Sequence, residues 1–277
     1  MESILKDTIL FGDCRETLKQ FDEKARCCVT SPPYYGLRDY GGEGNQIGQE
    51  QSPEEYIEEM VNVFRLVRDC LTDDGTLWLN IGDSYYNYRP GKSYPKQTFS
   101  KTKQDLPDYT PKRANRLTNY KEKDLIGIPW MLAFALRADG WYLRQDIIWN
   151  KPNPMPESMR DRCTKSHEYL FLLSKNQNYY FDVDSIKEPT VTGKGMKRKR
   201  SVWNINTSSY KDAHFAVYPE ELITPAILSG SEKGDIILDP FMGSGTTAKV
   251  AKSLGRYYLG CELNESYGDL INKRVYG

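Results

Sequence analysis

Short apolar runs alternate with amphipathic stretches along the chain, and this pattern predicts most of its secondary structure. Runs of about four to eight apolar residues indicate buried strands, whereas apolar residues spaced three and four apart indicate helices. Strands are predicted over residues 8–13, 25–31, 76–82, 141–149, 167–175, 235–239 and 257–263. Helices are predicted over residues 15–21, 52–71, 128–140, 218–230, 246–255 and 265–275.

The order of these elements indicates the fold class. Strands that alternate with helices predict an α/β fold, with a doubly wound, mostly parallel sheet and helices on both faces. The strands at 141–149 and 167–175 are joined by a proline-rich segment, and we expect them to pair antiparallel. The clearest helix starts with Ser52 as a cap, Pro53 in the first turn and Glu55 to complete a capping box.

Charge is segregated along the chain although the formal net charge is zero. Residues 84–123 show no hydrophobic period, which indicates a long irregular insertion. Residues 89–123 hold ten Lys/Arg against three acids (+7), and residues 187–200 hold six against one (+5), so the remainder sums to −12. Such segregation is typical of nucleic-acid-binding proteins, although a single charge run is more often a solvated loop.

The composition argues against several other classes of protein. No apolar run approaches the ~18 residues that span a membrane, and the N-terminus lacks the basic and apolar regions of a signal peptide. The six cysteines form no C-x-x-C pair, and with two histidines in the chain we expect no metal site. The cysteines are typical of free thiols in a reducing cytosol, so we expect a cytoplasmic protein.

The stretch ILDPFMGSGTT, residues 237–247, joins a strand to a helix through a glycine turn. The strand ends at Asp239, and Gly243 and Gly245 allow a tight turn and a close approach of the backbone to a ligand. Ligands of parallel sheets lie outside the carboxyl ends of the strands, where this turn is expected. The stretch matches neither the P-loop nor the G-x-G-x-x-G pattern, and on its own it is equally consistent with a plain turn.

Two acidic residues at strand ends add to this candidate site. Glu262 ends the next strand, 17 residues after Gly245, where a carboxylate can accept both hydroxyls of a ribose. Asp13 ends the strand at 8–13, where it could accept from the amino group of an adenine. Together with the glycine turn, Glu262 indicates a cofactor that contains adenosine.

The stretch TSPPYYGLRDYGG, residues 30–42, forms a stiff aromatic corner after a predicted strand. Pro32 and Pro33 fix the backbone and remove two N–H groups. The Ser31 hydroxyl and a prolyl carbonyl can together accept from an –NH₂ group, and Tyr34 offers a flat face to a base. This combination suits an exocyclic amine on a nucleobase extruded from its duplex, although an isolated SPPY is often a simple turn.

Several motifs in a fixed order resemble the amino-group DNA methyltransferases. They are TSPPY, GTLWLNIGDSYYN, the stretch from LIGIPW to FLLSK, HFAVYPEEL, DPFMGSGTT and GCELNESY. Their order matches the permuted branch of that family, in which the catalytic motif precedes the cofactor motif. The resemblance covers most of the chain except residues 86–122 and 185–212. It implies a seven-stranded, Rossmann-like methyltransferase sheet with one antiparallel strand, and S-adenosylmethionine as the cofactor.

The resemblance also implies roles for individual residues. The catalytic residues would be Ser31, Pro32, Pro33 and Tyr34. The cofactor-binding residues would be Asp13, Thr30, Phe215, Pro219, Asp239, Pro240, Phe241, Gly243, Ser244, Gly245, Thr246, Glu262 and Asn264. Residues 1–277 would form a single domain, in which the strand at 8–13, third in the family's sheet, opens the chain because of the permutation.

Double-stranded DNA is the expected substrate, and the basic segments are expected to bind it. The insertions at 84–123 and 185–212, with the proline-rich loop, would recognise the target site while Lys and Arg contact phosphates. The candidate DNA-binding residues are Lys112, Arg113, Arg116, Arg160, Arg162, Lys197, Arg198, Lys199 and Arg200. The resemblance also implies a protein encoded by a prokaryote or a phage, with a cognate restriction endonuclease that acts on the same site as a candidate partner.

The resemblance favours cytosine as the target base. Within the family, Ser in the first position of the tetrapeptide mostly accompanies cytosine N4, and Asp or Asn mostly accompanies adenine N6. We expect direct in-line transfer to a flipped base, with catalysis by positioning and electrostatics. The alternatives are adenine-N6 transfer, an RNA or protein methyltransferase of the same fold, and a DNA-binding module without activity. Carbon-5 methylation of cytosine is disfavoured, because it needs a cysteine nucleophile in a Pro-Cys pair and none occurs here.

Overall fold

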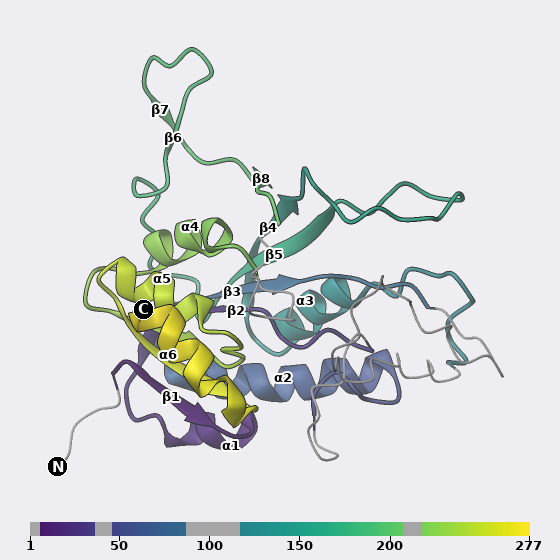
Figure 1. Cartoon of the computed structure of the whole chain (residues 1–277), viewed down its shortest axis with the longest axis horizontal. Coiled ribbons are helices and arrows are strands. Elements are labelled where there is room, and N and C mark those ends of the chain that lie inside the picture. The colour runs from purple at the N-terminus through teal and green to yellow at the C-terminus, as the bar shows by residue number, and fades with distance from the viewer. Residues whose placement is uncertain (1–5, 37–45, 87–116, 208–217) are drawn as a thin grey trace.

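The computed structural model describes residues 6–36, 46–86, 117–207 and 218–277, which form an eight-stranded sheet with helices on both faces (Figure 1). The strand order is β1-β10-β9-β2-β3-β5-β4-β8. These strands are β1 (Thr8–Phe11), β2 (Ala25–Thr30), β3 (Leu71–Ile81), β4 (Tyr142–Asn150), β5 (His167–Ser174), β8 (Val202–Asn204), β9 (Ile236–Asp239) and β10 (Tyr257–Glu262). In this sheet only β5 runs antiparallel to its neighbours, β3 and β4. The predicted fold class is therefore confirmed, with one strand more than expected.

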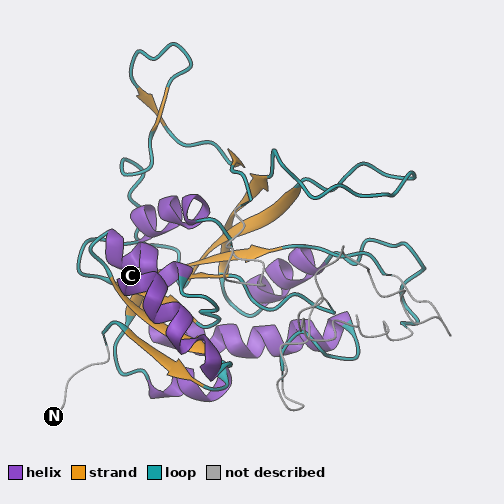
Figure 2. Cartoon of the chain, viewed as in Figure 1, coloured by secondary structure: helices purple, strands orange, loops and turns teal. Residues whose placement is uncertain are grey.

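Helices cover the two faces of the sheet (Figure 2). They bury two apolar cores, one on each face. One face is covered by α1 (Cys14–Thr17), α2 (Pro53–Cys70) and α3 (Ile128–Ala138), and the other by α4 (Glu220–Gly230), α5 (Thr246–Ser253) and α6 (Gly268–Tyr276). Met60 and Phe64 lie in the first core, and Leu222 and Ile271 lie in the second. Within the described ranges, every helix is too short or too polar to cross a membrane.

The predicted cap of α2 is present at its N-terminus. The Ser52 hydroxyl accepts a hydrogen bond from Glu55 N at 3.2 Å, and the Glu55 carboxylate accepts one from Gln51 N at 3.0 Å. These bonds satisfy backbone donors that would otherwise be unpaired at the start of the helix. The helix then begins at Pro53 and ends at Cys70, within one residue of the predicted bounds.

Three predicted elements differ from the structure. β3 begins at Leu71 rather than at residue 76, because Leu71 pairs with Ala25 and the ladder shifts register before Thr76 pairs with Cys27. The predicted helix at 15–21 is the single turn α1 followed by a 3₁₀ turn, η1 (Leu18–Gln20). The predicted final helix begins with a 3₁₀ turn, η2 (Glu265–Tyr267). The first predicted helix thus ends in a 3₁₀ turn, and the last one starts with such a turn.

The predicted basic insertion at 185–212 contains three short strands rather than a plain loop, as far as the structure describes it. β6 (Glu188–Pro189) and β7 (Met196–Lys197) pair antiparallel in a hairpin that projects from the sheet (Figure 1). We call residues 185–201 the arm. The chain returns from it as β8, which pairs parallel with β4. Residues 87–116 of the other predicted insertion lie outside the described residues.

The carboxyl ends of four neighbouring parallel strands meet at one edge of the sheet. β2 ends at Thr30, β9 at Asp239 and β10 at Glu262, and β1 is followed by Asp13. In register, Phe11 of β1 lies opposite Glu262. Because parallel strands direct their carboxyl ends to the same side, the residues singled out by the sequence are brought together there. This edge is the candidate functional site.

Candidate active site

Asp239 holds the glycine turn from inside the protein. Its side chain is fully buried, and both carboxylate oxygens accept hydrogen bonds from the protein. The donors are Thr247 Oγ1 at 2.5 Å, Thr30 Oγ1 at 2.6 Å, Phe241 N at 3.0 Å and Tyr218 OH at 3.1 Å. Burial raises the pKa of Asp239, and these hydrogen bonds oppose the rise. The polar atoms of Asp239 and Thr30 are thus committed to each other and to the turn.

The turn adopts a backbone conformation that suits glycine. Gly243 and Gly245 have φ angles of 54° and 82°, in the left-handed region. A Cβ on Gly245 would lie 3.1 Å from Ile271 Cγ2, so α6 packs directly against the turn. The buried Ser244 hydroxyl accepts a hydrogen bond from Arg274 Nη1 at 2.5 Å. A larger residue at Gly245 would therefore push the turn away from α6, and at either position a side chain would strain the backbone.

A buried hydroxyl without a partner marks the N-terminus of α5. Thr246 is 3% exposed, and its Oγ1 makes no hydrogen bond within the part of the chain that the structure describes. A buried hydroxyl without a hydrogen bond destabilises the folded protein unless a ligand or a water supplies the missing partner. Gly245 caps α5 without a side-chain hydrogen bond, so the first N–H groups of the helix are available to a negative group. These features fit the carboxylate of a bound cofactor.

Glu262 lies beside the glycine turn, where it gathers backbone donors. Its carboxylate accepts hydrogen bonds from Gly243 N at 2.7 Å and from Asn264 N at 2.9 Å. Burial raises the pKa of Glu262 from 4.5 to about 7, although the two N–H groups act in the opposite sense. Further hydrogen-bond donors, such as the hydroxyls of a ribose, would stabilise the ionised form of this buried carboxylate.

Replacing Glu262 with Gln should change how stability depends on pH. The pKa of Glu262 is raised in the folded state, so its ionisation costs stability as the pH rises from 4.5 through about 7. One pKa unit corresponds to about 1.4 kcal/mol, so the wild-type protein should lose about 2.5 kcal/mol relative to E262Q between pH 5 and pH 8. Urea unfolding of both proteins without cofactor measures this, with the exposed Glu265→Gln as the control. A pH-independent difference between E262Q and wild type would refute it.

Asp13 lies at the same edge, but its carboxylate is engaged with Arg15. It caps α1 by accepting from Arg15 N at 2.9 Å, and it pairs with the Arg15 guanidinium at 2.6 Å. Burial acts to raise the pKa of Asp13, but the bonds and charge of Arg15 leave it lowered. Gly12 N donates to Glu262 O at 2.8 Å, which places Asp13 beside Glu262. An adenine amino group bound here would donate a hydrogen bond to a carboxylate that already accepts from Arg15.

Residues 31–34, which we call the proline corner, follow directly on β2. Pro32 is buried, and Pro33 O accepts a hydrogen bond from Tyr56 OH of α2 at 2.9 Å. Tyr34 OH donates to Glu168 Oε2 of β5 at 2.7 Å. The corner is therefore held from two sides, while Ser31 remains half-buried at the edge of the sheet.

The other predicted cofactor residues surround the glycine turn or neighbour it. Pro219 is buried at the start of α4 and places Tyr218 against Asp239, and Pro240 is buried directly after β9. The Asn264 side chain accepts from Ser266 N at 3.0 Å and so caps η2 rather than facing the turn. Phe215 lies outside the described residues.

Several polar residues of the site were missed by the sequence analysis. Among the side chains that contact the predicted residues are those of Tyr56, Asn80, Glu168 and Tyr218, and Lys151 in turn pairs with Glu168. Their spacing in sequence does not relate them, because they meet only through the sheet. The one available signal is that Asn80 and Glu168 interrupt otherwise apolar strands.

The predicted DNA-binding residues lie on two projections, with Lys112, Arg113 and Arg116 outside the described residues. Arg160 and Arg162 belong to the loop between β4 and β5, where Arg162 pairs with Glu157 at 3.0 Å and lies 3.9 Å from the ring centroid of Tyr85. The remaining basic residues, at the end of the arm that leads to β8, are Lys197, Arg198, Lys199 and Arg200. Within this group Lys197 pairs with Glu188 across the hairpin at 3.2 Å.

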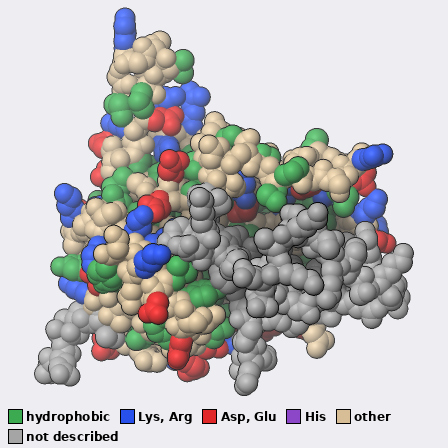
Figure 3. All heavy atoms as spheres, viewed as in Figure 1, with side chains coloured by type: hydrophobic (Ala, Val, Ile, Leu, Met, Phe, Trp, Pro, Cys, Tyr) green, Lys and Arg blue, Asp and Glu red, His purple; other side chains and the backbone are tan. Residues whose placement is uncertain are grey.

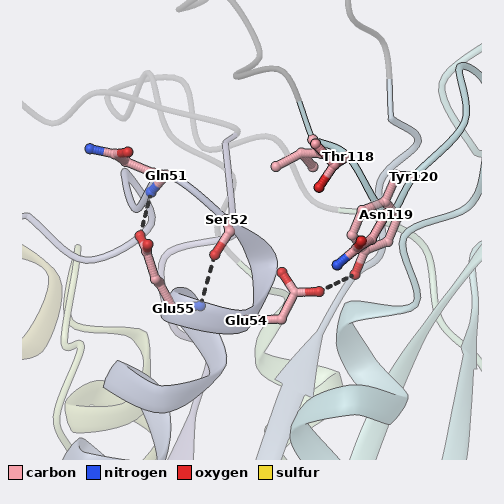
Figure 4. Close-up of a pocket in the computed structure, with 8 residues that line it drawn as sticks. Gln51, Ser52, Glu54, Glu55, Thr118, Asn119 and Tyr120 are labelled. Atoms are coloured by element: carbon pink, nitrogen blue, oxygen red, sulfur yellow. Dashed lines mark hydrogen bonds between the residues drawn. The ribbon is translucent and has the colours of Figure 1, made fainter.

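A separate hollow of about 230 Å³ lies beside the N-terminus of α2 (Figure 4). Its polar walls pair with one another, since Tyr120 OH donates to Glu54 Oε1 at 3.2 Å and Gln51 N donates to Glu55. Tyr35, which follows the proline corner, donates to Gln51 O at 3.4 Å. Because two glutamates line this hollow, it is unsuited to an anionic ligand, and we place the chemistry at the edge of the sheet.

Solved structures that include a DNA methyltransferase share this fold. The PvuII DNA methyltransferase (cytosine-N4-specific) gives a TM-score of 0.67 at 19% identity, over 98% of this chain and 93% of that one. The M1.HpyAVI–SAM complex gives a TM-score of 0.61 at 19% identity, over 98% and 99%. The fold is therefore that of a methyltransferase.

Sequence comparisons give the family. Residues 25–273 match the DNA methylase family, N6_N4_Mtase. The chain is 52% identical to the type II methyltransferase M.SmaI of Serratia marcescens, over 99% of this chain and 93% of that protein. It is 48% identical to the type II methyltransferase M.Cfr9I of Citrobacter freundii, over 98% and 88%. The chain belongs to the DNA methylase family, as its motifs predicted.

Proposed function

We propose that this protein is a site-specific DNA methyltransferase that transfers a methyl group from S-adenosylmethionine to the exocyclic N4 amine of cytosine. The observation that carries the proposal is the position of the proline corner next to the glycine turn. β2 and β9 are adjacent, with Cys28 opposite Leu238, and Thr30 donates to Asp239 between the two motifs. A clamp for an amine thus lies beside a site suited to a methyl donor that contains adenosine.

S-adenosylmethionine is the cofactor, and the edge of the sheet offers a partner to each of its parts. Glu262 would accept the ribose hydroxyls, and Asp13 beside it would accept from the adenine amino group. The unpartnered Thr246 Oγ1 and the N-terminus of α5 would bind the methionine carboxylate. Asp239 and Thr30 would act from behind by fixing the turn. When bound, the cofactor supplies an electrophilic methyl group on a sulfonium sulfur.

The proline corner would position the target amine. That amine is a weak nucleophile, because its lone pair is delocalised into the ring. Ser31 Oγ and Pro32 O would accept its protons and favour a pyramidal nitrogen, while Tyr34 packs against the base. With its protons accepted by Ser31 and Pro32, the amine would have its lone pair free to take the methyl group that the cofactor would supply. The electron pair of the C–S bond would leave with the sulfur, and one amine proton would pass to solvent.

Ser31 is the reason for choosing cytosine. Cytosine and adenine both carry an exocyclic amine that the corner could clamp after the base leaves the duplex. Serine at this position accompanies mostly cytosine-N4 transfer among the enzymes that the motifs resemble. Adenine-N6 transfer is the alternative, and the identity of the methylated nucleoside separates the two.

The two projections would bind DNA around the flipped base. Figure 3 shows Lys and Arg side chains along the arm and at the outer end of the loop between β4 and β5. Contacts from such side chains to phosphates supply affinity that does not depend on sequence. We also propose a cognate restriction endonuclease as a partner and the cytoplasm of a prokaryote, or of a phage host, as the place of action.

Neutralising the arm should weaken DNA binding and its salt dependence. The variant changes four residues to Gln: Lys197, Arg198, Lys199 and Arg200. Each lost phosphate contact lowers the slope of log K against log salt by about 0.9, so we expect the slope to fall by about 2 to 3 and the affinity about tenfold or more. Fluorescence anisotropy with duplex DNA at several salt concentrations measures both.

The matched control removes four exposed positive charges from the opposite edge of the sheet, at Lys6, Lys24, Lys233 and Lys252. The control should retain the wild-type slope. Equal slopes for the arm variant and the wild-type protein would remove the arm from the DNA-binding surface.

A label-transfer assay tests the proposed substrate class. Purified protein and S-adenosylmethionine with a labelled methyl group are incubated with duplex DNA, structured RNA or bulk protein. We expect label in DNA only, and competing RNA should not reduce it. Label in RNA or protein would support the rival enzyme classes, and absence of S-adenosylmethionine binding by calorimetry would support a module without activity.

A further inference from the structure

A cluster of polar side chains lies behind the proline corner, and apart from Tyr34 none of its members was predicted as a site residue. Tyr34 OH donates to Glu168 Oε2 at 2.7 Å, and the Lys151 ammonium forms an ion pair with the other oxygen, Oε1. Asn80 Nδ2 donates to Glu168 Oε2 at 3.3 Å and to Tyr169 O at 3.1 Å. Glu168 therefore accepts from three side chains and is the centre of the cluster.

The sheet holds the ion pair in place. Glu168 lies on β5 opposite Trp149 of β4, and Lys151 follows β4 directly. Lys151 N donates to Ser166 O at 2.7 Å, and its ammonium lies 4.3 Å from the ring centroid of Trp149. The side chains of Lys151 and Glu168 are 17% and 16% exposed, so solvent screens the pair weakly.

Close packing also confines the ring of Tyr34. A Cβ on Gly82 would lie 2.8 Å from Tyr34 Cε2 and 3.3 Å from Glu168 Cδ. Tyr34 and Glu168 thus pack against bare backbone at the end of β3. The hydrogen bond between them is held in one geometry.

The anionic partner decides which way the Tyr34 hydroxyl points. A phenol has one hydrogen, and Tyr34 donates it to Glu168, so its lone pairs can only accept. Burial and the charge of Glu168 raise the pKa of Tyr34, so its hydroxyl keeps its proton. Because that hydroxyl is bound to Glu168, the ring of Tyr34 is held at the end of the proline corner.

We propose that the Lys151–Glu168 ion pair is a positioning pair, which acts through Tyr34 OH to hold the ring of Tyr34 in the orientation that packs against the target base. This inference rests on the proposed role of the proline corner in amine methylation. A carboxylate can only accept, so Tyr34 OH donates to Glu168, and this bond holds the ring in one orientation. Lys151 balances the charge of Glu168.

Single-turnover methyl transfer to duplex DNA tests the pair. Glu168→Gln keeps the shape but can donate as well as accept, so we expect a rate about 10- to 100-fold lower, with the affinities for S-adenosylmethionine and DNA within about twofold. Tyr34→Phe should lower the rate to a similar extent. Adding E168Q to Y34F should cause no further loss, because the hydroxyl through which Glu168 acts is gone.

Two further variants complete the design. The double variant E168Q/K151M leaves no unpaired charge, so it serves if E168Q alone does not fold, and it should show the same loss. Asp139→Asn is the matched control, because Asp139 is 13% exposed, pairs with Arg65 and Arg68, and lies outside the site. Its rate should stay within about twofold of wild type.

The outcomes separate the inference from the proposed function. An E168Q rate within twofold of wild type, or an equal E168Q loss with and without Tyr34 OH, would overturn the positioning role alone. A Ser31→Ala variant that keeps the full rate would instead overturn the proposed function of the corner. Loss at Ser31 together with a non-additive loss at Glu168 and Tyr34 supports both.

Discussion

Replacing Ser31 with alanine is expected to lower the rate of methyl transfer about a hundred- to a thousandfold, while S-adenosylmethionine binds within about twofold of wild type. The methylated nitrogen gains positive charge as it forms the new bond, and an acceptor already in place stabilises that charge without reorganising. Removing one such preorganised group from an active site typically costs a factor of this size. Ser31 lies at the end of β2, beside the cofactor turn but outside the hydrogen bonds that hold Asp239.

The measurement is a single-turnover rate with duplex DNA, together with calorimetry of cofactor binding. Ser253→Ala, at the last residue of α5, controls for the loss of a hydroxyl elsewhere. The Ser253 variant should match the wild-type protein in both measurements. A Ser31 variant with a rate within threefold of wild type would show that the hydroxyl does not take part in catalysis.

Replacing Asp239 with Asn should destabilise the protein by about 3 kcal/mol and abolish measurable cofactor binding. The buried carboxylate of Asp239 accepts four hydrogen bonds, three of them from hydroxyls, and so ties β2, α5 and the segment just before α4 to the turn. An amide offers one acceptor and one donor group, so donors that now point at Asp239 would face another donor. Because the glycine turn depends on these bonds, the cofactor site should be lost before the fold.

Urea unfolding gives the stability and calorimetry gives the cofactor affinity of D239N. Asp235→Asn is the matched control, because Asp235 lies just before the same strand and accepts a backbone hydrogen bond from Glu232 N, but belongs to the opposite edge. We expect the control to lose about 1 kcal/mol or less and to bind cofactor normally. Normal cofactor binding by D239N would mean that the turn does not depend on Asp239.

The core of the fold could be predicted because its signals are local. The capping residues of α2 and the apolar runs of β9 and β10 place these elements within one or two residues of the structure. β8 was missed, because Val202–Asn204 is too short to show a period and is defined by pairing with β4. The start of β3 was misplaced for a similar reason, since its pairing with Ala25 is a long-range contact.

The candidate site was predictable only where it depends on backbone. The two prolines predict the proline corner and the two glycines predict the glycine turn, because their effect on the backbone does not depend on distant neighbours. Lys151, Glu168 and Tyr218 gave no comparable signal, since each is an ordinary polar residue until the sheet brings it to Tyr34 or Asp239. The burial that raises the pKa of Glu262 to about 7 is likewise a product of packing.

The most direct test of the proposed function is nucleoside mass spectrometry of DNA methylated by the purified protein. Duplex DNA is incubated with S-adenosylmethionine that carries a labelled methyl group, and the DNA is then digested to nucleosides. We predict labelled N4-methylcytosine in the wild-type reaction and its near absence with Ser31→Ala. N6-methyladenine as the sole labelled product would contradict the choice of cytosine, and unlabelled DNA would contradict the proposed function itself.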